Sequence, residues 1–120
     1  MVAYCPDQLS PAVHRMLPES LGVKEVAYAD PEGPALVDWV DYEKRIDALD
    51  PASFAQQILR EAGTTHSVWF VAQDGYRVFG ATCSQVGSVL ASERGVPTIA
   101  VGSRGGIYEH ATLARFPGTG

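Results

Sequence analysis

The run SVWFVA at residues 67–72 constrains the fold most, because apolar side chains, most of them β-branched or aromatic, fill nearly every position. A strand with one buried face alternates apolar and polar residues, whereas a strand covered on both faces is apolar throughout. Residues 67–72 are therefore predicted to form the central strand of a parallel sheet. Parallel neighbours need long crossover connections, so helices are expected before and after this strand.

The rest of the chain alternates between strand and helix patterns. The clearest helix follows Asp50 and Pro51, which suit an N-cap and a first helical position, and Gly63 suits its end. In the same way, Ser10 is predicted to cap the first helix. The expected strands are residues 2–4, 23–29, 67–72, 97–101 and 111–116, and the expected helices are 10–17, 51–62 and 82–94. Residues 30–50 read as irregular, with room for one short helix.

This order predicts a three-layer α/β sandwich of the Rossmann or flavodoxin-like kind, with a mostly parallel sheet. The expected strand order is 2-1-3-4, with strand 5 beside strand 4. Residues 102–110 are too few for a crossover helix, so the last strand is predicted to be antiparallel and at an edge. In such a sheet a ligand crevice opens between the first and third strands, where the topology switches.

Size and charge narrow the function classes. A chain of 120 residues and 12.9 kDa indicates a single domain, 1–120, in which the Gly- and Pro-containing tail 117–120 is expected to fray. The net charge of -5 argues against nucleic-acid binding. No apolar run approaches the roughly 20 residues of a membrane span. No spacing of His, Cys or Gly residues indicates a metal or another cofactor.

The two cysteines, Cys5 and Cys83, fall in the two loops beside the expected crevice. Because neighbouring strands lie about 4.8 Å apart, the two residues are expected within the range of a disulfide. Two buried free thiols remain the alternative. A third interpretation makes Cys83 a nucleophile at a helix N-terminus, but no histidine falls in either loop to serve as its base.

Four polar residues of the same loops are candidate ligand contacts: Asp7, Gln8, Tyr76 and Arg77. Each also has a structural interpretation, because Asp7 or Gln8 suits a helix cap and Arg77 suits an ion pair with a carboxylate. Trp39 and Tyr42 could form an exposed aromatic platform for a sugar ring or a partner, or could cover the core beneath a long loop. No pair of carboxylates at glycosidase spacing is evident, so catalytic residues are not assigned.

Four segments carry a family resemblance: VAYCPDQLSPAVHRML, VDWVDYEKR, VWFVAQDGYRVFGATCSQV and YEHATLARF. They resemble the C-terminal soluble domain of actinobacterial multi-spanning membrane glycosyltransferases, which are similar to dolichyl-phosphate-mannose protein mannosyltransferases. The resemblance covers nearly the whole chain. It implies a domain excised from a larger protein, lying on the extracytoplasmic face of the membrane. In that family the transfer chemistry belongs to loops of the membrane part, so no catalytic residue is carried over.

Three hypotheses follow. The first is a non-catalytic extracytoplasmic domain of a membrane glycosyltransferase, which would contact the rest of its parent protein, an acceptor, a glycan or a lipid-linked sugar. The second is a free-standing cytosolic domain or enzyme that binds a small molecule, which requires free thiols and an open polar pocket. The third is a protein-interaction module. An exposed apolar patch around Trp39, Tyr42 and the edge strand would indicate it.

Overall fold

The computed structural model describes residues 1–28, 35, 40, 42–73, 81–102 and 111–120, and of Tyr42 only the backbone. It is a mixed α/β fold with an open five-stranded sheet in the order β2-β1-β3-β5-β4. The strands are β1 (Val2–Cys5), β2 (Glu25–Ala27), β3 (Val68–Ala72), β4 (Thr98–Val101) and β5 (Thr112–Phe116). The strand predicted from SVWFVA lies at the centre, as expected.

The strand order differs from the predicted one at the end of the chain. β1 pairs in parallel with β2 and β3, but β5 inserts between β3 and β4 and runs antiparallel to both. The prediction of an edge position for the last strand was therefore wrong, whereas its antiparallel direction was confirmed. Two of the strand pairings are parallel and two are antiparallel. Burial explains the arrangement: Ala114 and Phe116 of β5 are buried in the core, whereas every residue of β4 is exposed.

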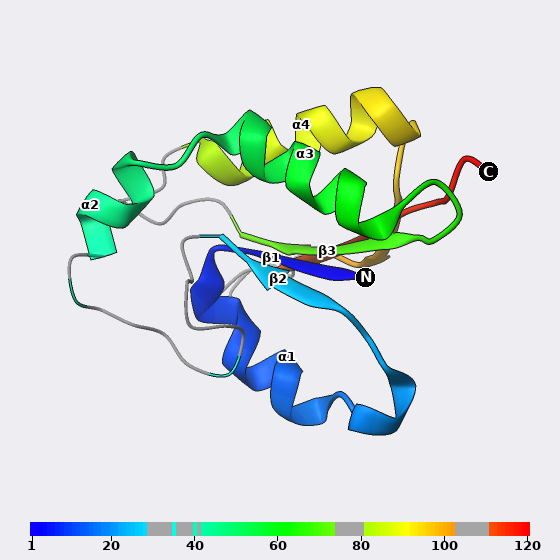
Figure 1. Ribbon diagram of the computed structural model, residues 1–120, viewed down its shortest axis with the longest axis horizontal. Helices are drawn as coiled ribbons and strands as arrows, with labels where there is room; N and C mark the ends of the chain where they lie inside the picture. The colour runs from blue at the N-terminus through cyan, green and yellow to red at the C-terminus, as the bar shows by residue number, and fades with distance from the viewer. Residues whose placement is uncertain (29–34, 36–39, 41, 74–80, 103–110) are drawn as a thin grey trace.

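Helices cover both faces of the sheet (Figure 1). They are α1 (Ser10–Met16), α2 (Tyr42–Asp47), α3 (Pro51–Ala62) and α4 (Thr82–Arg94), with 3-10 turns η1 (Asp7–Leu9) and η2 (Glu19–Leu21). α3 and α4 lie side by side on one face, and α1 lies on the other. The larger core lies beneath α3 and α4 and includes the fully buried Ile58, Val86 and Leu90. A smaller cluster packs beneath α1.

The helix caps show one correct prediction and one error. Oδ2 of Asp50 accepts hydrogen bonds from the backbone amide and the hydroxyl of Ser53, at 3.0 and 2.9 Å. Both bonds favour the ionised form and lower the pKa of Asp50. Ser10, in contrast, does not cap α1. Because η1 runs directly into α1, Ser10 already has helical angles, and its hydroxyl donates back to the carbonyl of Asp7 at 2.6 Å.

Arg94, the last residue of α4, is a buried cation that joins three segments. Its Nη1 donates to the carbonyl oxygens of His66 and Pro117 at 3.1 and 2.9 Å, and its Nη2 donates to the carbonyl of Gly63. These carbonyls belong to the end of α3, the approach to β3 and the C-terminal tail. Arg94 thus satisfies carbonyl oxygens that no helix or strand ladder would pair.

Residues 117–120 are held in place, not frayed. The amides of Thr119 and Gly120 both donate to the carbonyl oxygen of Thr64, at 2.7 and 3.1 Å. Together with the bond from Arg94 to Pro117, they fix the tail against the turn that precedes β3.

Candidate functional site

The predicted crevice lies at the carboxyl ends of β1 and β3, where the amide of Gln73 donates to the carbonyl of Cys5 at 2.9 Å. Asp7 is here but is completely buried within η1. The Gln8 amide oxygen is buried too and has no hydrogen-bond partner among the described residues. Neither side chain caps α1. Tyr76 and Arg77 lie outside the described residues, so Asp7 and Gln8 are the only two of these four ligand candidates that the structure positions.

The proposed aromatic platform also lies outside the described part of the chain. Trp39 is not described, and of Tyr42 only its backbone position at the start of α2 is given. The platform stays a prediction.

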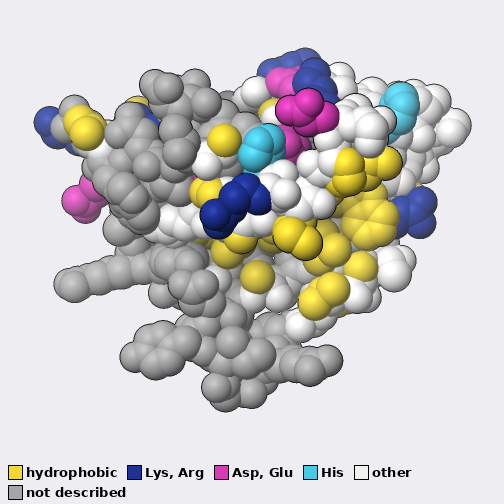
Figure 2. Space-filling model, turned by 90° about the horizontal axis from the view of Figure 1, so that it is seen from below, with side chains coloured by type: hydrophobic (Ala, Val, Ile, Leu, Met, Phe, Trp, Pro, Cys, Tyr) yellow, Lys and Arg dark blue, Asp and Glu magenta, His cyan; other side chains and the backbone are white. Residues whose placement is uncertain are grey.

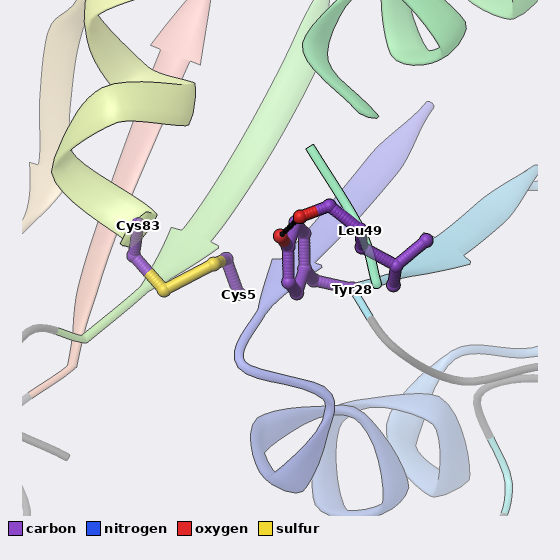
Figure 3. The surroundings of a disulfide bond; sticks show 4 residues. All are labelled: Cys5, Tyr28, Leu49 and Cys83. Atoms are coloured by element: carbon purple, nitrogen blue, oxygen red, sulfur yellow. Dashed lines mark hydrogen bonds between the residues drawn. A yellow bond between two sulfur atoms is a disulfide. The ribbon is translucent and has the colours of Figure 1, made fainter. Parts of the chain in front are cut away.

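Cys5 and Cys83 form a disulfide, with their Cα atoms 5.5 Å apart (Figure 3). The bond joins the carboxyl end of β1 to the first turn of α4, and both residues are buried. On the other side of Cys5, the buried ring of Tyr28 extends to Leu49, whose carbonyl accepts its hydroxyl at 3.0 Å. The bond therefore lies at the end of β1 beside the expected crevice, and it leaves neither cysteine as a thiolate for nucleophilic chemistry.

A polar network fixes α1 to the sheet. The hydroxyl of Tyr4 donates to Oε1 of Glu25 at 2.6 Å, and Nδ1 of His14 lies 2.6 Å from Oε2. Burial and the neighbouring carboxylate raise the pKa of Tyr4, which keeps the phenol protonated as a donor. A carboxylate that orients an imidazole is also part of many general-base sites. Among the described residues, however, no three His, Cys, Asp or Glu side chains gather as metal ligands.

An apolar hollow lies beside α1, and we call it the α1 groove. It has a volume of ≈ 540 Å³ between α1 and the sheet strands β3, β5 and β4. Figure 2 shows hydrophobic side chains gathered on this face of the molecule. All lining residues but Thr112 are apolar: Met1, Val2, Val13, Leu17, Val23, Trp69, Val71, Val101, Ala111, Thr112 and Leu113.

A second hollow of ≈ 570 Å³ lies on the opposite face, between α4 and β5. It borders the disulfide at Cys83, and Gln73, Ser84 and Ser88 give it a more polar lining than the α1 groove. It is the hollow nearest the predicted crevice, but it opens beside α4 and not between β1 and β3.

The sequence analysis did not find the α1 groove. Trp69 and Leu113 were recognised as strand residues, but their neighbourhood depends on the pairing of β3 with β5. The only local signal was the alternation in TLARF, which places Leu113 and Arg115 on one face and Ala114 and Phe116 on the other. That alternation predicts only one buried face, so it does not reveal an apolar groove on the face of Leu113.

No protein-family model, curated protein or solved structure matches this chain. Within the described part of the chain, no helix is both long enough and apolar enough to cross a membrane.

Proposed function

We propose that this chain is a non-catalytic domain of a membrane-embedded glycosyltransferase, located on the extracytoplasmic side of the membrane. The observation that carries the proposal is the disulfide between Cys5 and Cys83, which are 0% and 2% exposed. Disulfides persist in oxidising compartments and are rare in the cytosol. The resemblance of the four sequence segments supplies the parent class, and it places the transfer chemistry in the membrane part.

Two features support an accessory role for the domain. The parallel β2-β1-β3 half of the sheet supports a flavodoxin-like origin, in which loops after the strands contact ligands. Of the four candidate residues, Asp7 is fully buried, so we propose Gln8, Tyr76 and Arg77 for contacts with an acceptor or a glycan. The exposed apolar residues Val96, Ile99 and Val101 support docking to the rest of the parent protein.

The disulfide also separates the hypotheses. A cytosolic small-molecule domain requires free thiols and a polar pocket that includes Asp7, whereas here the thiols are bonded and Asp7 is buried. A simple interaction module has support from the exposed strand β4, but it does not account for a bond across the core.

The location is tested with one new thiol at an exposed position. Ser92 lies on the exposed side of α4, and the two cysteines of the domain are bonded, so Ser92→Cys introduces the one reactive thiol of the domain, and the parent protein without the substitution gives the background labelling. Intact cells that express the parent protein are treated with a membrane-impermeant maleimide. We expect labelling in intact cells equal to that after lysis. Labelling only after lysis would contradict the extracytoplasmic location.

The accessory role is tested by deleting residues 1–120 from the parent gene. We expect weaker glycan transfer by the cells that carry the deletion, because the contacts of the domain are lost. We also expect no transfer by the purified domain when it is given a lipid-linked mannose donor. Transfer by the purified domain alone would contradict the non-catalytic assignment.

A further inference from the structure

The sheet is wider than the helix that covers its α1 face. Five strands at about 4.8 Å spacing extend over roughly 19 Å between the outer strand axes, whereas one helix is about 10 Å across. On the opposite face α3 and α4 share the sheet, but α1 is alone. It covers Val2 and Tyr4 of β1, and among the described residues no helix lies above β5 and β4. The α1 groove is this uncovered strip.

The lining of the groove suits a hydrocarbon and not a polar guest. Val13 and Leu17 form the α1 wall, Leu113 lies on the floor, and Val101 forms the opposite wall. The hydroxyl of Thr112 and the indole N–H of Trp69 are the only polar side-chain groups among the lining residues. Ligand sites in proteins have volumes of about 300–1,000 Å³ and mostly apolar linings, and the α1 groove falls within both descriptions. Burying a polar ligand in the groove without hydrogen-bond partners would cost free energy, whereas an alkyl chain has no polar groups and carries no such cost.

A cation lies beside Trp69, one of the residues that line the groove. Arg115 is the cross-strand partner of Trp69, and its guanidinium lies 5.8 Å from the centre of the indole ring. Its Nε donates to the hydroxyl of Ser67 at 3.2 Å. Among the described residues Arg115 has no carboxylate partner, although the chain carries an excess of acidic residues. An exposed guanidinium next to an apolar groove complements an anionic head attached to an apolar chain.

We propose that the α1 groove binds a single-chain anionic amphiphile, with its hydrocarbon chain along the groove and its phosphate, sulfate or carboxylate head at Arg115. The inference goes beyond the proposed function and does not depend on it. It identifies a ligand class for the isolated chain, whatever protein the chain belongs to.

The test uses dodecyl phosphate below its critical micelle concentration as the probe. The chain has two tryptophans, so Trp39→Phe leaves Trp69 as the only indole and makes its emission a reporter of the groove. We expect a saturable change in emission. Val101→Asp places a carboxylate on the groove wall and should weaken binding about tenfold or more.

The matched control is Ile99→Asp. Ile99 and Val101 lie on the same strand and are 55% and 57% exposed, but Ile99 pairs with Ala114, which faces the core beneath α3 and α4. Ile99→Asp should leave binding unchanged. Arg115→Gln should weaken dodecyl phosphate about threefold, as for an exposed charge pair, and leave neutral dodecyl maltoside unaffected.

Four outcomes would overturn the proposal. The first is the absence of saturable binding, and the second is an equal loss of affinity for dodecyl phosphate in Val101→Asp and Ile99→Asp. The third is displacement of the probe by inorganic phosphate alone. The fourth is binding to phosphatidylglycerol vesicles without binding to the monomeric probe. Amide chemical shifts of the unsubstituted protein provide a test that needs no variant. Val101 and Leu113 should shift on titration with dodecyl phosphate, and Ile58 in the opposite core should not. The reverse pattern would also refute it.

Discussion

Breaking the disulfide between Cys5 and Cys83 should remove much of the stability of the domain. The two residues are 78 positions apart, so the bond closes most of the chain into one loop in the unfolded state. The chain-entropy relation gives about 4.5 kcal/mol for a loop of this length near 25 °C. Small domains are stable by about 5–15 kcal/mol in total, so the loss is a large share of that margin. Alanine is the better replacement, because serine would bury an unpaired hydroxyl.

The assay is equilibrium unfolding in urea of the wild type, Cys5→Ala, Cys83→Ala and the double variant. Either single change breaks the same bond, so both should lose a similar free energy of unfolding, and the double variant should lose little more. The slope of free energy against urea should rise in all three, because an unfolded chain without the cross-link exposes more surface.

Reductant provides the internal control. It should destabilise the wild type to the level of the single variants and leave Cys5→Ala unchanged. The reasoning would be refuted if the losses of the two single variants added up in the double variant, since additivity means two independent side chains. A wild type equally stable with and without reductant would refute it as well.

Three further predictions concern single side chains. Arg94→Met leaves three carbonyls without their donor and should lower the free energy of unfolding in urea by about 3 kcal/mol, and a loss within error of zero would exclude the joining role of Arg94. Tyr4→Phe removes a hydrogen bond to Glu25 and should cost about 1.5 kcal/mol at neutral pH. Because the pKa of Tyr4 is raised in the fold, its phenol contributes fully to the free energy of unfolding below about pH 10, and this contribution is lost as the pH rises further. The urea midpoint of Tyr4→Phe should therefore fall less steeply at alkaline pH than that of the wild type. The pKa of Asp50 is lowered in the fold, so its helix cap stabilises the domain above about pH 4, and this stabilisation is lost as the pH falls. Asp50→Ala should lower the urea midpoint at pH 7. A difference in midpoint from the wild type that is equally large at pH 2 would contradict the cap.

The features that the sequence predicted correctly are those that local physics decides. α3 and α4 have the predicted bounds because a helical spacing of apolar residues and a terminal glycine mark each of them, and α3 also has the Asp50 cap. The closeness of Cys5 and Cys83 was predictable because the ends of neighbouring parallel strands meet at one edge of the sheet.

Strand order is not decided locally. Residues 102–111 link β4 to β5 and can return the chain on either side of β4, so turn geometry does not choose between the two. Composition also misleads here, because TIAV of β4 is as apolar as a buried strand and yet is exposed. The choice depends on the packing of Ala114 and Phe116 against residues far away in the sequence. The groove and the position of Arg115 depend on the same choice, and for that reason they could not be predicted.

The insertion of β5 also decides which apolar surface is better suited to a ligand, the edge of β4 or the α1 groove. It displaces β4 to the edge of the sheet, so that in the described part of the chain β4 has one unpaired edge and the groove has no helix over it. Bare edge strands pair with other chains unless something interrupts their ladder. In β4 the pairing register shifts between Ile99 and Val101, and Pro97, which lacks an amide hydrogen, directly precedes the strand. Both features weaken the outer edge as a template for another strand. The groove combines a mostly apolar lining with the guanidinium of Arg115 beside Trp69, so it is the better candidate for recognition.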